Sequence, residues 1–350
     1  MRKRTETKKV WVKDLQVGGQ DKVIIQTMTT HPTKAIEKIV EEIHTLATHG
    51  AQLVRLAILD TEDAMAIKTI KSLTQVLLVA DIHFDYKLAL LAIENGIDKI
   101  RINPGNIGHK EHVKQVVNAC KKHGVPIRIG VNLGSLEKDL LKTYGRTAKA
   151  MVESAKRHVQ ILEDEGFEDI IISLKASDVK LTIEAYLLAA ETFKYPLHIG
   201  ITEAGPTYAG IIASSAGLGT LLYHGIGDTL RISLSGPRTE ELKACKTLLS
   251  QFGLYARPKL IACPTCARLS YDMAPIVKKV EAYLENHPTQ ITVAVMGCAV
   301  NGPGEARDAD IGIAGGMREG LIFIQGKIVK KVPQEHLYDA LIEAIENHNK

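Results

Sequence analysis

The chain has the length and composition of a globular protein with a large and a smaller domain. Of its 350 residues, 45% are hydrophobic and 24% are charged, a balance that excludes an intrinsically disordered chain. Lysine and arginine exceed aspartate and glutamate by 44 − 40 = +4, which is too small an excess for a nucleic-acid-binding protein, so we expect no nucleic-acid partner.

No segment predicts secretion or membrane insertion. The N-terminus is basic, but no apolar run follows it before Lys13, as a secretory signal would require. The longest uncharged stretch, residues 204–227, contains Pro206 and several glycines, and it predicts a buried, glycine-rich helix rather than a membrane span. We therefore expect a cytoplasmic protein without a membrane partner.

Short β-branched runs alternate with longer stretches of helical period from about residue 23 to residue 251. The predicted strands are 23–28, 53–58, 76–82, 99–104, 126–132, 169–175, 197–203 and 229–234. Eight such units predict a TIM (β/α)8 barrel, whereas a doubly wound sheet usually has fewer strands. No G-x-G-x-x-G or Walker sequence follows the first strand, which also favours the barrel.

Several predicted strands carry charges that are unusual in a barrel core. Arginines lie inside four of the strands and a lysine ends a fifth: Arg55, Arg101, Arg128, Arg231 and Lys175. Any one of them could face outward and pair with a helix carboxylate. Together they favour an anionic ligand, because unpaired buried charge is costly and guanidinium forks suit phosphate or diphosphate.

Further polar residues gather at the carboxyl ends of the strands, where TIM-barrel active sites lie. The candidate substrate-binding residues are Asp81, His83, Asn103, Asn132, Ser173 and Ser233, in addition to the five cations. Glu203 closes the seventh predicted strand and is a candidate proton donor or base, although a salt bridge to a neighbouring arginine is equally compatible with its position. We expect His198 to be an ordinary core histidine.

The pattern changes after Pro258, so we expect a barrel domain over residues 1–257 and a smaller α/β domain over 258–350. Three of the five cysteines, Cys263, Cys266 and Cys298, fall within this second domain, and a C-x-x-C pair with a distant third cysteine is a strong metal signal. A thioredoxin-like redox pair would give no role to the third cysteine. Structural zinc with one further ligand is the other alternative.

A glycine-rich segment after the third cysteine favours iron and sulfur over zinc. Residues 301–306 read N-G-P-G-E-A, a turn that delivers the carboxylate of Glu305. Three thiolates and this weak oxygen ligand would suit a 4Fe-4S cluster with one exchangeable iron, although Glu305 could instead cap a helix. Cys120 and Cys245 are expected to be ordinary buried thiols.

Seven motifs occur in the order found in one enzyme family. They are Q-T-M-T-T (26–30), A-D-I-H-F (80–84), R-I-N-P-G-N-I-G (101–108), R-I-G-V-N-L-G-S-L (128–136), H-I-G-I-T-E-A-G (198–205), C-P-T-C (263–266) and G-C-A-V-N-G-P-G-E-A (297–306). In these motifs the chain closely resembles the bacterial 4-hydroxy-3-methylbut-2-enyl diphosphate synthases, over about residues 20–330.

The resemblance implies a function and a set of roles. The family reduces 2-C-methyl-D-erythritol 2,4-cyclodiphosphate by two electrons, with ring opening and loss of a hydroxyl, in the non-mevalonate isoprenoid pathway. By similarity, the four arginines and Lys175 would hold the phosphates, with Asn103, Asn132 and Ser233 as hydrogen-bond partners. The cluster ligands would be Cys263, Cys266, Cys298 and Glu305, and Glu203 would be the proton donor.

The resemblance also implies partners. Flavodoxin or ferredoxin would supply the electrons, and a homodimer would share its active site between subunits. The step to Cys263 is too short for the extra domain that some members carry, so the compact two-domain form is expected. From the residues alone, a non-redox phosphate-binding barrel enzyme with a structural zinc module remains the alternative.

Overall fold

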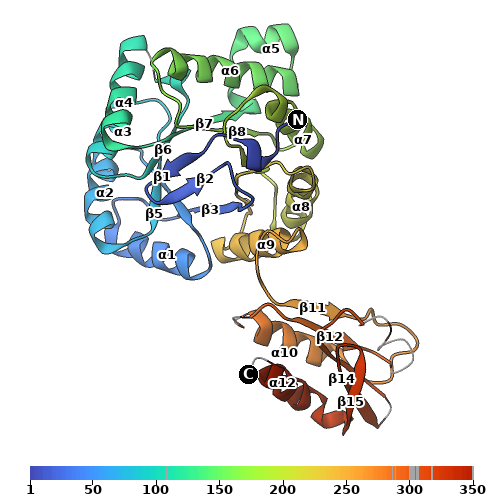
Figure 1. The fold of residues 1–350 in the computed structure, drawn as a ribbon. Helices are drawn as coiled ribbons and strands as arrows, with labels where there is room; N and C mark the ends of the chain where they lie inside the picture. Colours follow the sequence, from blue (N-terminus) through green and yellow to red (C-terminus); the bar gives the residue numbers. More distant parts are fainter. Residues whose placement is uncertain are drawn as a thin grey trace. The chain divides into compact units, whose positions relative to one another are not determined.

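The computed structural model (Figure 1) describes residues 1–107, 109–285, 287, 289–298, 304, 307–316 and 318–348. These residues form two compact units, Met1–Tyr255 and Ala256–Lys350. The boundary expected from the sequence, between residues 257 and 258, lies two residues further along the chain. Glu305, the expected fourth cluster ligand, is outside the described residues.

Eight parallel strands form the sheet of the first unit. They are β3 (Ile24–Met28), β4 (Leu53–Ala57), β5 (Leu77–Asp81), β6 (Lys99–Ile102), β7 (Ile127–Asn132), β8 (Ile170–Lys175), β9 (His198–Ile199) and β10 (Thr229–Leu230). Their order in the sheet is β8-β7-β6-β5-β4-β3-β10-β9, and a parallel bridge between Ile172 and Leu197 brings the two ends together. The predicted TIM barrel is therefore confirmed.

Helices surround this sheet, as Figure 1 shows. They are α1 (Ile36–Thr48), α2 (Thr61–Leu73), α3 (Tyr86–Glu94), α4 (Lys110–His123), α5 (Lys138–Tyr144), α6 (Ala148–Asp164), α7 (Val179–Thr192), α8 (Thr207–Tyr223) and α9 (Arg238–Gln251). Helix α1 is typical, because Ile39, Ile43 and Leu46 recur at helical spacing and are buried on one face. The Asp60 and Asp178 carboxylates accept N-terminal backbone N–H groups of α2 and α7 and thereby cap them.

The uncharged stretch 204–227 contains α8, as expected, and Gly217 explains part of its composition. A Cβ atom on Gly217 would lie 2.9 Å from the Ile201 side chain, so glycine lets this helix approach the barrel closely. The helix still exposes Tyr208 and Tyr223, so it is buried on one side only. No helix among the described residues is both long and apolar enough to span a bilayer.

The seventh and eighth strands are shorter than the sequence suggests. We predicted 197–203 and 229–234, but regular pairing covers only His198–Ile199 and Thr229–Leu230. Arg231 still donates its backbone N–H to Ile199 O at 3.1 Å, which extends the alignment slightly. Beyond that point Glu203 has a left-handed backbone, with φ at 53°, and the extended run ends there.

A hairpin that the sequence analysis missed lies against the amino-terminal end of the barrel. It pairs β1 (Val10–Val12) with β2 (Leu15–Val17), and their valines pack on Ile24, Leu53 and Ile171. Ile24 and Leu53 are the first residues of β3 and β4, so the hairpin closes this end with apolar contacts. The opposite end, where the carboxyl ends of the strands meet, carries the polar residues.

The second unit is a five-stranded mixed sheet with helices packed on it. Its strands, in sheet order, are β11 (Lys259–Ala262), β12 (Thr292–Met296), β13 (Ile311–Ala314), β14 (Glu319–Ile324) and β15 (Lys327–Pro333). The first three strands run parallel, and the last two pairings are antiparallel. Helices α10 (Ala274–Glu285) and α12 (Leu337–His348) share one core with the sheet, which confirms a smaller α/β domain.

Candidate functional site

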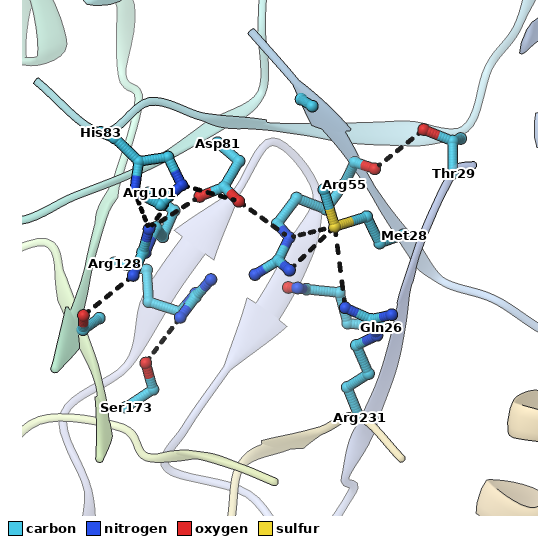
Figure 2. A network of polar contacts seen from close by, with 12 residues as sticks. Gln26, Met28, Thr29, Arg55, Asp81, His83, Arg101, Arg128, Ser173 and Arg231 are labelled. Carbon is cyan, nitrogen blue, oxygen red and sulfur yellow. Dashed lines mark hydrogen bonds and ion pairs between the residues drawn. The ribbon is translucent and has the colours of Figure 1, made fainter. Parts of the chain in front are cut away.

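The barrel holds a layer of cationic side chains near the carboxyl ends of its strands. Figure 2 shows Arg55, Arg101, Arg128 and Arg231 converging from different strands. The sheet register explains part of this gathering, because Arg101 of β6 lies directly beside both Asp81 of β5 and Arg128 of β7. The five predicted cations thus lie inside the barrel, and all but the half-buried Arg55 are buried.

Two inward-facing glycines make room for these long side chains. A Cβ atom on Gly130 of β7 would lie 2.4 Å from Arg101 Nε, and one on Gly200 would lie 2.6 Å from Lys175 Nζ. Both distances are shorter than any real Cβ contact, so a larger residue would displace the cation. Gly130 and Gly200 therefore belong to the site, because only glycine leaves room for the neighbouring cation.

Asp81 is the counter-ion for one side of the cation layer. Its carboxylate lies 3.2 Å from Arg101 Nη1 and 3.6 Å from Arg55 Nε, with His83 Nε2 at 3.8 Å. Burial alone would raise the pKa of Asp81, but the charges of Arg55 and Arg101 outweigh it and hold the pKa below its usual value. Asp81 is therefore an ionised residue that orients two arginines.

Arg128 has no such counter-ion in the part of the chain that the structure describes. Its Nη1 donates to Ser173 Oγ at 2.6 Å, while Nε and Nη2 are buried and find no partner among the described residues. Burial, followed by repulsion from Arg55 and Arg101, lowers its pKa well below the ordinary value. A buried guanidinium with free donors is a site prepared for an anion.

Lys175 and its neighbours lie beside this guanidinium. The side chain of Lys175 is buried, and its ammonium has neither a hydrogen bond nor an ion pair within the described part of the chain; burial and the nearby arginines lower its pKa strongly. Asn103 is buried, and its Oδ1 accepts the Gly130 backbone N–H at 2.9 Å. Asn132 and Ser233 are half-buried at the strand ends, where the sequence analysis placed them.

Glu203 and His198 differ from the other candidates in exposure. Glu203 is exposed and left-handed, and no ion pair involving it occurs in the described residues, so the salt-bridge alternative finds no support there. His198 is fully buried; its Nδ1 lies 2.6 Å from Thr229 Oγ1, and its Nε2 has no partner in the described residues. Burial, and after it the charge of Lys175, keeps its pKa well below 6.5, so the ring is neutral.

Three residues of the site escaped the sequence analysis. The Met28 thioether accepts from Arg55 at 2.9 Å and lies 3.8 Å from Arg231 Nη1, which separates two like charges with a polarizable group. Lys99 donates to Gln26 Oε1 at 3.1 Å deeper in the barrel. Glu241 contacts Arg231 from α9. Strand alternation would have placed Met28 and Lys99 inside, but no sequence signal singles out a helix glutamate.

The three clustered cysteines lie at the carboxyl edge of the second sheet. Cys263 follows β11 directly and donates its backbone N–H to Val295 O at 3.0 Å, while Cys298 follows the neighbouring parallel strand β12. A Cβ atom on Gly297 would lie 3.9 Å from Cys263 Sγ, so the two segments approach closely. Cys266 is exposed, and hydrogen bonds from the Arg268 backbone and side chain lower the pKa of its thiol.

All three thiols are free, and this donor set fits the thiolate ligands that an iron-sulfur cluster requires. Among the described residues no three His, Cys, Asp or Glu side chains come close enough to hold a metal ion, and the expected fourth ligand lies outside them. Cys120 and Cys245 are buried, as expected. Burial raises the pKa of both, for Cys245 to about 12, so they are inert thiols.

Comparisons of structure show the fold of the barrel. A dihydropteroate synthase from Xanthomonas albilineans superposes with a TM-score of 0.51 at 13% identity, covering 71% of this chain and 98% of that one. A truncated 3-deoxy-D-arabino-heptulosonate 7-phosphate synthase from Thermotoga maritima gives 0.50 at 13% identity, covering 71% and 95%. At this identity the likeness concerns the TIM barrel alone.

Comparisons of sequence show the family. Proteins named 4-hydroxy-3-methylbut-2-en-1-yl diphosphate synthase (flavodoxin) are 57% identical in an Exiguobacterium species and 56% identical in Bacillus subtilis, each over 98% of this chain and 92% of the relative. The profile of the GcpE TIM-barrel domain matches residues 7–246, and that of the GcpE protein C-terminal domain matches residues 259–347. With both domains matched in order, the chain belongs to the GcpE family.

Proposed function

We propose that this chain reduces 2-C-methyl-D-erythritol 2,4-cyclodiphosphate to (E)-4-hydroxy-3-methylbut-2-enyl diphosphate, the reaction for which its relatives are named. The observation that carries the proposal is the buried Arg128 guanidinium, inside a layer of cations, with two nitrogens that find no partner among the described residues. A buried guanidinium without a carboxylate partner is costly, and an anion that entered the barrel would offset this cost. A cyclic diphosphate supplies two linked phosphates of matching charge.

The barrel residues bind and orient this substrate. Arg128 has two nitrogens without a partner among the described residues, so it would take phosphate oxygens directly, and we expect Lys175 beside it to do the same. Asp81 keeps Arg55 and Arg101 in fixed orientations. Asn132 and Ser233 lie at the rim, where they would reach hydroxyl or phosphate oxygens. Exposed Glu203 would deliver a proton to the oxygen that leaves as water.

Cys263, Cys266, Cys298 and Glu305 would hold a 4Fe-4S cluster at the edge of the second sheet. Such a cluster supplies electrons one at a time and, at an iron without a thiolate, a Lewis acid. The free, partly exposed thiols and the lowered pKa of Cys266 support thiolate ligation.

The proposal also covers the electron donor, the oligomeric state and the cellular compartment. We expect flavodoxin as the electron donor, as in the relatives' names, with ferredoxin as the alternative. We also expect a cytoplasmic homodimer in which the active site is shared between subunits. These points follow from family membership and from the resemblance of the motifs.

The proposal is tested on protein purified without oxygen. Iron, sulfide and zinc are counted on one sample, its visible spectrum is recorded, and turnover of the cyclodiphosphate is measured with reduced flavodoxin. About four irons per chain, brown colour and formation of the diphosphate product are expected. Colourless protein with one zinc and no turnover would leave the alternative, a non-redox phosphate-binding enzyme.

Two single variants test the assigned acids. Glu305→Ala should lose iron or its reactivity, and Glu203→Ala should keep the cluster and bind substrate but turn over slowly. An intact cluster with full turnover in both variants would contradict both assignments.

A further inference from the structure

A second buried carboxylate, Glu241, contacts the cation layer. It is 1% exposed and belongs to the first turn of α9, the helix that follows β10. The partial positive charge of a helix N-terminus stabilises a carboxylate at this position. Its Oε2 lies 3.4 Å from Arg231 Nε, so Glu241 pairs with Arg231, whereas Asp81 pairs with Arg55 and Arg101.

Four donors use up the oxygens of Glu241. The Leu234 backbone N–H and Arg238 Nη1 donate to Oε1 at 2.9 and 2.5 Å. Thr27 Oγ1 and Arg231 Nε donate to Oε2 at 3.3 and 3.4 Å. The residue therefore joins β3, the segment after β10 and α9 at one point, with no lone pair left to bind a substrate.

The contact between Glu241 and Nε determines the orientation of the Arg231 guanidinium. Because Glu241 binds the Nε side of the guanidinium, Nη1 points towards Met28 Sδ, 3.8 Å away, and towards Arg55 beyond it (Figure 2). The charge of Glu241 also acts on Arg55. Arg128 and Lys175, between the two carboxylates, have no carboxylate partner in the described residues.

We propose that Glu241 is a positioning residue for the diphosphate: it contacts no substrate, and it fixes Arg231 so that the guanidinium faces the anion. This inference rests on the proposed function, since it concerns the same anion site. The inference predicts weaker anion binding when Glu241 is neutralised, whereas the change of charge alone predicts tighter binding. Removing a negative charge beside the site should tighten anion binding through the field, whereas losing the position of Arg231 should weaken it.

The variant Glu241→Gln separates these effects. An amide has one acceptor oxygen, so two of the four donors must face an N–H₂ group, and the negative charge that holds Arg231 Nε is lost in either orientation of the amide. Isothermal titration with inorganic pyrophosphate and with the cyclodiphosphate is made on the anaerobically purified full chain. We expect affinity to fall roughly tenfold, and KM to rise by a similar factor with a smaller change in kcat.

Glu240→Gln is the matched control. It makes the same change of charge on the adjacent residue of α9, which has no contact with Arg231 among the described residues, and affinity should be unchanged or slightly higher. In an Arg231→Met background, Glu241→Gln should have no further effect on affinity, because its action runs through the arginine. A purely structural role would lower affinity equally in both backgrounds.

If the glutamine variant is too unstable to purify, Glu241→Asp replaces it. The shorter side chain keeps the charge but withdraws it from Arg231, and affinity should fall to an intermediate level. Unchanged or tighter binding in Glu241→Gln, or unchanged binding in Glu241→Asp when it is the variant tested, overturns the inference. Failure of the wild-type chain to bind either anion would instead contradict the proposed function.

Discussion

Arg128 Nη1 donates to Ser173 Oγ at 2.6 Å, and this hydroxyl is the one partner that the guanidinium has among the described residues. A hydroxyl is a neutral acceptor, so the charge of Arg128 is uncompensated in a buried position. Desolvation of an ion costs several kcal/mol when no counter-ion offsets it. The free protein therefore contains a local instability that a bound diphosphate would relieve.

The variant Arg128→Met should show both sides of this relationship. We expect the free protein to become more stable by on the order of 1 kcal/mol, because an uncompensated charge is replaced by an apolar side chain of similar length. Pyrophosphate affinity should fall by about a hundredfold or more. Urea unfolding and titration calorimetry measure the two quantities on the same preparation.

Arg157→Met is the control for this charge change. Arg157 lies on the outer surface of α6, paired with Asp139, and its side chain is 47% exposed. Neither stability nor pyrophosphate affinity should change appreciably. Destabilisation by Arg128→Met with affinity retained would show that the guanidinium is structural rather than reserved for an anion.

Gly130→Ala should disrupt the site through a single methyl group. The new Cβ would lie 2.4 Å from Arg101 Nε, so the guanidinium must leave its present position, in which it contacts Asp81 and the Gly130 carbonyl. We expect the anion affinity to fall roughly tenfold and stability to drop by about 1–3 kcal/mol, as for other overpacked positions. Gly134→Ala is the control, because nothing lies within 4 Å of its added Cβ. Equal behaviour of the two variants would contradict the role of Gly130.

The sequence predicted the barrel well because its signals are local. Each of the eight strands lies within a predicted β-branched run, and the inward cations were inferred from the number of charges inside those runs. The hairpin at 10–17 was missed because two three-residue strands are too short for a period to be recognised. Its role, closing the barrel end, depends on contacts with strands far along the chain.

The electrostatics of the site could not be predicted in the same way. Asp81 was placed with the substrate ligands, and only the three-dimensional contacts reveal its ion pairs with Arg55 and Arg101. Glu241 is one of two adjacent glutamates in the first turn of a helix, and nothing in the sequence distinguishes it from an exposed glutamate. Its burial results from the packing of α9 against β3, a contact between segments about 200 residues apart.

Alanine variants of the cysteines should separate ligands from buried thiols. Cys263→Ala, Cys266→Ala and Cys298→Ala should each lose most iron and sulfide, because a cubane needs its thiolates. Cys245→Ala should keep its iron and lose only some stability, since that thiol is fully buried and inert. Iron and sulfide analysis with visible spectra distinguishes them. Iron retained in Cys298→Ala would exclude that residue as a ligand.

A shared active site predicts complementation between two inactive variants. Arg128→Met impairs the barrel and Cys298→Ala impairs the cluster unit, and in a mixed dimer one site would combine the two intact units. After subunit exchange we expect about a quarter of wild-type turnover, since about half the dimers are mixed and each has one active site of two. Size-exclusion chromatography with light scattering tests whether the chain is a dimer. No recovery despite proven exchange would assign each active site to a single subunit.

Asp228 should give the fold a pH dependence of unusual sign. Its carboxylate accepts the Thr7 hydroxyl and the Leu197 backbone N–H, each at 2.7 Å, and it is 1% exposed. Burial raises its pKa from 3.8 to about 6, although these hydrogen bonds and the charge of Arg4 partly oppose the shift. Between about pH 4 and 6 the folded state therefore binds a proton that the unfolded state has released.

Stability from this group therefore falls as the pH rises through that window and stays lower above it. The variant Asp228→Asn removes the titration, so urea unfolding of both proteins from pH 4.5 to 7.5 isolates the effect. The free energy of unfolding of the wild type, minus that of the variant, should decrease by on the order of 2 kcal/mol from pH 4.5 to about pH 6.5 and then level off. Asp81, whose pKa is lowered, acts in the opposite sense but cancels in the difference. A difference that rose with pH would show that Asp228 is ionised at low pH in the folded protein, and that the N-terminal segment is held by a charge rather than by a protonated acid.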